Sequence, residues 1–204
     1  MGLLDIITGR RAVKGPAPDR LFAISTAYVT LQSEHAINPA GTAAIVFQAL
    51  ATSEFEATLR EMEDVVKATG SESGTTVSTQ DDSYGYRWMI LRNPADKPSV
   101  EDLAVGINAV SGSIEAGGHG DRLLCAVFAF AQAPAASAGG GSPEGRRIYF
   151  IYNYKRGYWY PFVPAGGEEQ RSTERELQIK AQIADELPIE PELERWFPLW
   201  GIPI

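Results

Sequence analysis

Alternation between apolar and polar positions divides most of the chain into short strands and amphipathic helices. Runs rich in β-branched and aromatic residues suit a pleated, half-buried surface and are typical of strands. By this criterion the predicted strands cover residues 28–31, 42–50, 75–79, 84–92, 123–131, 146–154 and 158–163. A loop containing Asn38-Pro39 is predicted between the first two of these strands.

Three segments instead repeat their apolar residues at helical spacing, and each begins with a capping motif. Glycines end the first two of these segments, at Gly70 and at Gly117-Gly118. The sequence therefore predicts three main helices. Their opening motifs are Ser53-x-x-Glu56, Ser99-x-x-Asp102 and Thr173-x-x-Glu176.

The resulting order is strand, strand, helix, repeated three times, with the third unit lengthened by a loop. Within this order, residues 42–131 follow the succession strand, helix, strand, strand, helix, strand, which is that of ferredoxin-like folds. Strand pairs that alternate with helices are typical of the α+β class. We therefore expect an extended, mostly antiparallel sheet with the three main helices packed against it.

The composition of the chain changes at three places, which suggests its domain organisation. Residues 17–204 are predicted to form a single α+β domain, because a chain of 204 residues is long enough to bury one core. Within it, residues 133–145 are rich in alanine, glycine and serine and are expected to form a flexible loop. Residues 188–204 are expected to dock on the domain, and residues 1–16 form an N-terminal arm.

The N-terminal arm carries a few apolar residues in a short helical pattern, followed by three cations. Apolar residues beside cations suit an anionic lipid surface, so one interpretation is peripheral contact with a membrane. Because so short a helix is marginal alone, the other is a terminal helix docked on the domain. The residues concerned are Leu3, Leu4, Ile6, Ile7, Arg10, Arg11 and Lys14.

The most aromatic stretch of the chain, Tyr149 to Pro164, is predicted to be a β-hairpin that turns at Lys155-Arg156-Gly157. Burying half of its aromatic side chains contributes on the order of 20 kcal/mol of gross hydrophobic stabilisation. We therefore expect most of the hairpin to lie in the core. The cations at its tip remain candidates for binding an anion or a carboxylate of a partner.

The apolar stretch Trp196 to Trp200 must either dock on its own domain or remain available to another protein. Self-docking is favoured, because the aromatic sheet offers a large surface to cover. The parts left open are the candidate partner-binding site. Its residues are Lys155, Arg156, Tyr158, Trp159, Trp196, Phe197 and Trp200.

Charge and hydropathy narrow the classes of function. The formal net charge of −8 argues against a nucleic-acid-binding protein that relies on general attraction to phosphates. The acidic residues between 168 and 194 are predicted to form a solvated face, with a basic partner as the alternative. No apolar run approaches the roughly 18 to 20 residues needed to cross a bilayer, so we expect neither a spanning nor a secreted protein.

Residues with catalytic or metal-binding chemistry are few and dispersed. His35, His119 and the single cysteine, Cys125, would have to converge in space to form a zinc site or a nucleophile. Asp81-Asp82 is interpreted as a solvated turn between strands. The glycine clusters lack the ending of a phosphate-binding loop. The residues therefore predict no catalytic, cofactor or metal site.

Several unusual motifs resemble the PspAB family of bacterial PspA-associated proteins. They are MGLLD at the start, DSYGYRW at 82–88, LLC at 123–125, YKRGYWYPF at 154–162 and LPIEPELERWFPLWG at 187–201. The resemblance implies association with PspA, a coiled-coil, membrane-remodelling protein that responds to envelope damage. It also implies proximity in the genome to a membrane metalloprotease of the HtpX type, and it supplies no catalytic residues.

Taken together, these features predict a non-enzymatic, cytoplasmic adaptor of the envelope-stress, or phage-shock, response. Contact with the membrane is expected to be at most peripheral, at its inner face. One alternative is an undescribed hydrolase or nucleotide-dependent enzyme whose residues converge only in three dimensions. Another is a peripheral membrane sensor that acts through the N-terminal arm.

Overall fold

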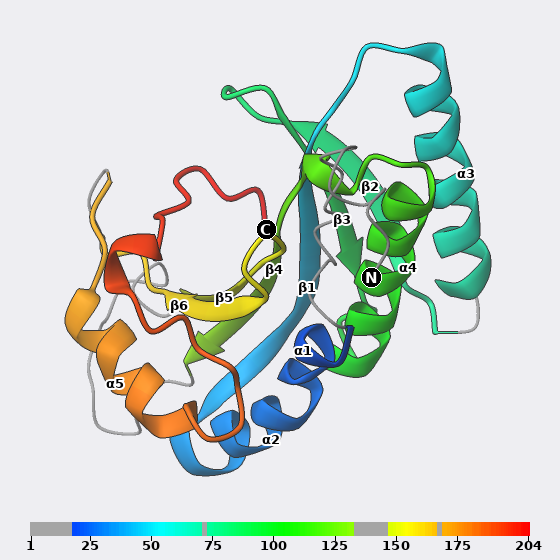
Figure 1. Cartoon of the computed structure of the whole chain (residues 1–204). Helices are drawn as coiled ribbons and strands as arrows, with labels where there is room; N and C mark the ends of the chain where they lie inside the picture. Colours follow the sequence, from blue (N-terminus) through cyan, green and yellow to red (C-terminus); the bar gives the residue numbers. More distant parts are fainter. Residues whose placement is uncertain (1–17, 71–72, 133–146, 167–168) are drawn as a thin grey trace, which may run out of the picture.

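The computed structural model of the protein describes residues 18–70, 73–132, 147–166 and 169–204 (Figure 1). Within these ranges, antiparallel strands form a 6-stranded sheet in the order β2-β3-β1-β4-β5-β6. The strands are β1 (Ile37–Gln48), β2 (Thr76–Asp81), β3 (Tyr86–Arg92), β4 (Leu123–Gln132), β5 (Arg147–Asn153) and β6 (Tyr158–Phe162). The α-helices are α1 (Pro18–Phe22), α2 (Ile24–His35), α3 (Ser53–Gly70), α4 (Val100–Ala116) and α5 (Thr173–Ile183).

The predicted α+β class with an antiparallel sheet is confirmed. The elements β1, α3, β2, β3, α4 and β4 follow one another in the predicted ferredoxin-like order. Strands β5 and β6 then extend the sheet beyond β4. The predicted threefold repetition is correct only for the second unit, since three strands, β4 to β6, precede α5 in the third.

Different parts of the chain cover the two faces of the sheet. On one face, the helices bury apolar side chains such as Ile45, Phe128 and Phe150. On the other face, Trp196, Trp200 and their neighbours in the C-terminal segment (residues 188–204) pack over the strands. Figure 1 shows this segment, in orange-red and red, on the side of the sheet away from α3 and α4. None of the described helices is long and apolar enough to cross a membrane.

Residues 28–31 lie in α2, so the strand predicted there is wrong and the first unit is helix, strand, helix. The β-branched and aromatic residues of this stretch favour a strand locally. The helix nevertheless buries Ile24, Ala27 and Leu31 on one side, at positions i, i+3 and i+7. Packing of this stripe against β1 and α4 outweighs the local preference.

Strand β1 begins at Ile37, so the loop predicted at Asn38-Pro39 is also wrong. These residues pair with β4, whereas pairing with β3 starts only at Thr42. Proline lacks an N–H group and is tolerated where a strand has one neighbour or an irregular register. A register shift between Pro39 and Thr42 provides such a position.

The helix caps differ in part from the predicted ones. Ser99 accepts the N–H of Asp102 at 3.0 Å, as predicted. In α3, however, the side chain that accepts the N–H of Phe55, at 3.3 Å, belongs to Thr52. The prediction of Ser53 as the cap was therefore displaced by one residue. The N-terminal arm and the loop at 133–145 lie outside the described residues.

Candidate functional site

The aromatic hairpin consists of β5 and β6, and most of its side chains are buried, as predicted. Successive side chains of a strand point to opposite faces of the sheet. Phe150 and Tyr152 accordingly face the helices, and Tyr149 and Ile151 face the C-terminal segment. The hairpin therefore contributes to both cores of the domain.

The tip of the hairpin turns at Gly157, whose φ of 69° lies in the left-handed region that glycine adopts without strain. Its N–H donates to the carbonyl of Asn153 at 2.8 Å. Lys155 is exposed. Tyr158 is half-buried, with the guanidinium of Arg20 at 5.0 Å and that of Arg156 at 6.0 Å from its ring.

Arg156 is bound within the protein by two carboxylates of the C-terminal segment. Its Nη2 donates to Glu190 Oε1 at 3.0 Å and to Glu192 Oε1 at 3.1 Å, and its Nε donates to Glu190 Oε2. The hydrogen bond with Glu190 is the main cause that raises the pKa of Arg156. The geometry therefore gives Arg156 the role of joining the hairpin tip to the C-terminal segment.

Trp159 is fully buried and marks the place where the C-terminal segment joins the edge of β6. Its backbone N–H donates to Pro188 at 2.9 Å, and its carbonyl accepts the N–H of Glu190 at 2.8 Å. Its indole N–H donates to the carbonyl of Arg20 at 2.7 Å. Trp159 thus connects three distant parts of the chain and presents no surface to a partner in this structure.

The tryptophans of the C-terminal segment are attached to the sheet, whereas Phe197 is not covered. Trp196 is buried and stacks on Tyr160 with ring centroids 6.1 Å apart. Trp200 is half-buried and meets Phe162 edge to face at 5.2 Å. Phe197 is 57% exposed, although its carbonyl accepts the hydroxyl of Tyr160 at 3.0 Å. Of the three, Phe197 is the side chain most available to another protein.

Glu176 and Glu190 are buried, so the prediction that all acidic residues of 168–194 are solvated is wrong for these two. Glu176 was also expected to cap its own helix. Its carboxylate instead accepts the backbone N–H of Val163 at 2.9 Å and the guanidinium of Arg171, with Nη2 at 2.6 Å. The expectation of a solvated Glu176 came from its charge, and the local sequence does not show which cation lies beside the helix.

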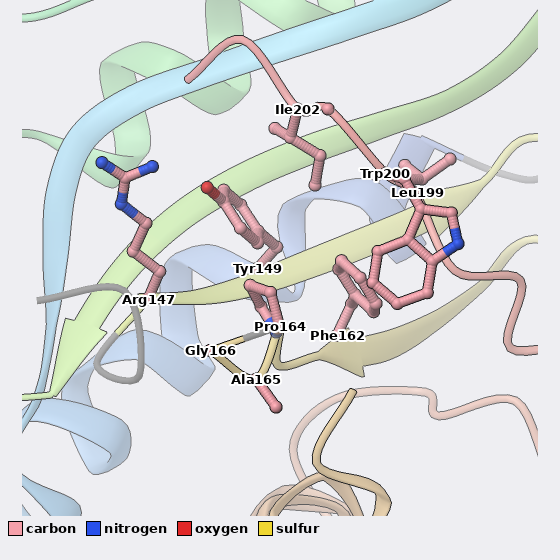
Figure 2. A pocket seen from close by; sticks show the side chains of 10 residues that line it. Arg147, Tyr149, Phe162, Pro164, Ala165, Gly166, Leu199, Trp200 and Ile202 are labelled. Carbon is pink, nitrogen blue, oxygen red and sulfur yellow. The ribbon is translucent and has the colours of Figure 1, made fainter. Parts of the chain in front are cut away.

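A cavity of about 480 Å³ lies between the C-terminal segment and the outer strands (Figure 2). Tyr149 and Phe162 form one wall, with their rings stacked at a centroid distance of 6.3 Å. Arg147 lies on the same face of β5 as Tyr149, two residues away. The alternation of side chains along β5 could have placed Arg147 and Tyr149 on one face from the sequence. It could not show that the C-terminal segment covers this face. The other lining residues are Pro164, Ala165, Gly166, Leu199, Trp200, Gly201 and Ile202.

The two histidines lie at opposite ends of β4. The carbonyl of His35 accepts a hydrogen bond from Gln132, the last residue of the strand, at 3.1 Å. His119 precedes the short 3₁₀ turn that leads into the other end of the strand. Because a strand of 10 residues spans roughly 30 Å, the two imidazoles do not converge.

Cys125 is separated from both histidines and is unsuited to nucleophilic chemistry. It lies in the core on the C-terminal-segment face, whereas His119 packs edge-on against Phe55, at 5.1 Å, in the core on the helix face. Burial raises the pKa of the Cys125 thiol to about 12. The thiol is therefore protonated at neutral pH, and a protonated thiol is a poor nucleophile.

Asp81 is the last residue of β2 and pairs with Arg87, so the turn predicted at Asp81-Asp82 begins only at Asp82. The guanidinium of Arg87 binds Asp81 and holds the pKa of that carboxyl below its ordinary value. Asp82 accepts the N–H of Tyr84 and the indole N–H of Trp88, each at 2.9 Å. In the part of the chain that the structure describes, no three His, Cys, Asp or Glu side chains are placed to hold a metal ion.

The fold and the site define an α+β protein whose aromatic hairpin is covered by its own C-terminal segment. The chain belongs to the PspAB family, PspA associated protein B, whose sequence model matches residues 1–204. The name of the family indicates an accessory role in association with PspA. No curated protein and no solved structure matches the chain.

Proposed function

We propose that the protein is a non-enzymatic, cytoplasmic adaptor of the envelope-stress response that binds PspA or a related membrane-stress protein directly. The observation that carries this proposal is the match of the whole chain to a family of PspA-associated proteins. The dispersed positions of His35, His119 and Cys125 are consistent with an adaptor, because none of them lies near the others.

The surface proposed for PspA consists of the exposed side chains of Phe197 and Leu193, and we call it the Phe197 surface; the exposed Lys155 at the hairpin tip is a second candidate contact. Phe197 and Leu193 are 57% and 43% exposed. The buried Trp196, which lies between them in the sequence, is fixed by a hydrogen bond that its indole N–H donates to the carbonyl of Glu190 at 3.0 Å. Exposed apolar side chains on such a fixed support suit the apolar stripe of an amphipathic helix. The cation of Lys155 suits an acidic residue of the same partner.

The experiment measures binding of the intact protein to purified PspA by isothermal titration calorimetry. We expect Phe197→Ala to weaken binding about tenfold, because exposed aromatic residues often dominate the free energy of binding. Val105→Ala is the matched control, since Val105 is 56% exposed on α4, in the helix layer. This control should bind as the unmodified protein does.

The possible outcomes separate the association from the surface. Absence of binding by the unmodified protein would contradict direct association with PspA. Equal affinities for the unmodified protein and Phe197→Ala would contradict only the Phe197 surface. Phe197 is a better choice for substitution than Trp196, because removal of a buried indole would disturb the fold itself.

A membrane metalloprotease of the HtpX type is a second proposed partner, on the basis of the resemblance alone. It is tested by capture from detergent-solubilised membranes of stressed cells on the immobilised protein, with Val105→Ala as the control. Recovery of PspA without the protease would contradict this second partner and leave the first one intact.

A further inference from the structure

The cavity beneath the C-terminal segment combines one cation with aromatic walls. Tyr149, Phe162 and Trp200 supply the walls, and Arg147 lines the cavity from β5 (Figure 2). Among the residues that the structure describes, no carboxylate lies within ion-pair distance of Arg147. Within that part of the chain its guanidinium is therefore not neutralised by a carboxylate, unlike those of Arg156 and Arg171, although it interacts with the hydroxyl of Tyr149 on the cavity wall.

The C-terminal segment is attached on both sides of the cavity by hydroxyl groups of the sheet. Tyr160 donates to the carbonyl of Phe197 at 3.0 Å, and Tyr149 donates to the carbonyl of Ile204 at 2.8 Å. Between these two attachments the chain turns at Gly201, which has a φ of 67°. The segment thus arches over the sheet, and the cavity is the space that this arch encloses (Figure 2).

The geometry points to a binding site for a small organic anion with an aromatic or aliphatic body. A guanidinium binds a carboxylate, sulfonate or phosphate through two parallel hydrogen bonds. Aromatic walls favour a flat or apolar body, and a volume of about 480 Å³ is within the range of small-molecule sites. Because the formal net charge of the chain is −8, attraction of an anion must come from a local cation such as Arg147.

The probes are two dyes that share an N-phenylnaphthylamine skeleton and differ in charge. The anionic dye is 8-anilino-1-naphthalenesulfonate, and the neutral dye is N-phenyl-1-naphthylamine. We expect the intact protein to bind one anionic dye per chain, with a saturable rise in dye fluorescence. Arg147→Gln should lower the affinity for the anionic dye about tenfold, because a charge-assisted hydrogen bond is lost. The affinity for the neutral dye should not change.

Two further variants make the result specific to the cavity. Trp200→Ala should weaken both dyes, since it removes part of the wall that they share. Lys155→Gln removes an exposed cation at the hairpin tip, outside the cavity, and should change neither affinity. Circular dichroism establishes that each variant is folded before its affinity is compared.

Two results would overturn the inference. The cavity is not the binding site of the anionic dye if the binding of this dye does not saturate. The same conclusion follows if the dye binds the unmodified protein and the variants Arg147→Gln and Trp200→Ala with equal affinity. If Arg147→Gln weakens both dyes equally, the site does not select an anion. Neither result depends on PspA, so the inference stands or fails separately from the proposed function.

Discussion

The partly exposed Arg171 and the buried Glu176 form an ion pair that also holds the C-terminal segment. Arg171 donates from Nε and Nη2 to the carboxylate of Glu176, which is completely buried. Its remaining Nη1 donates to the carbonyl of Trp196 at 2.6 Å. The carboxylate also accepts the N–H of Val163, just after β6, at 2.9 Å. This pair therefore joins the hairpin, α5 and the C-terminal segment at one point.

Replacement of Arg171 should destabilise the whole domain. Arg171→Gln leaves the carboxylate of Glu176 buried without its cation, which we expect to lower the free energy of unfolding by about 3 kcal/mol. Arg175→Gln is the control, because Arg175 is bound to Gln132 and Gln178 on a partly exposed part of α5. It should lower the free energy of unfolding by less than about 1 kcal/mol. Urea unfolding followed by tryptophan fluorescence measures both, and equal losses would contradict the assigned role of Arg171.

Replacing each of two glycines inside α4 by alanine should change the free energy of unfolding in opposite directions. A Cβ at Gly106 would lie 2.3 Å from Cδ2 of Leu91, a fully buried side chain, whereas one at Gly112 meets no atom within 4 Å. Gly112→Ala should raise the free energy of unfolding by about 0.5–1 kcal/mol, since alanine favours helix. Gly106→Ala should lower it by about 1–3 kcal/mol through overpacking. Thermal unfolding distinguishes them, and stabilisation by both would mean that Leu91 can move aside freely.

The protein should lose stability in alkaline solution. Burial raises the pKa of Cys125 from 9.0 to about 12, and burial is likewise the main cause that raises the pKa of Tyr152 from 10.0 to about 12. Folded molecules therefore keep protons that the unfolded chain releases. The contribution of Cys125 is fully present below pH 9 and is lost between pH 9 and pH 12, at about 1.4 kcal/mol per pH unit.

The measurement is the free energy of unfolding in urea at several pH values between 7 and 10.5. We expect a shallow dependence on pH below 9 and a decline above it. Cys125→Ala removes one of the buried acids, so its decline above pH 9 should be less steep. The same slope in both proteins would show that Cys125 does not contribute to the alkaline loss.

Much of the sheet could be predicted from local pattern. Alternation of apolar residues located five of the strands with small errors at their ends, and Gly157 located the hairpin turn. The predictions failed where local preference and tertiary packing disagree. Residues 28–31 prefer a strand by composition but form a helix, because Ile24, Ala27 and Leu31 together make one buried stripe.

The candidate site was predicted only in part. Aromatic residues at Tyr149 to Pro164 and at Trp196 to Trp200 marked the two segments that meet. The sequence did not show which of these aromatic side chains stay exposed, because exposure depends on what packs above each side chain. Phe197 is exposed and Trp196 buried, although the two are adjacent in the sequence and both apolar.

The sequence by itself determined the α+β class, the hairpin and its burial, and the resemblance to the PspAB family. These follow from short-range periodicity, from the large apolar area of the aromatic side chains and from unusual motifs. Only the tertiary structure decided that Glu190 binds Arg156, which lies 34 residues away, and that an arch of the C-terminal segment encloses a cavity beside Arg147. Such pairings depend on which polar groups are buried next to each other, because a buried polar group needs a hydrogen-bond partner. Long-range packing decides which groups these are.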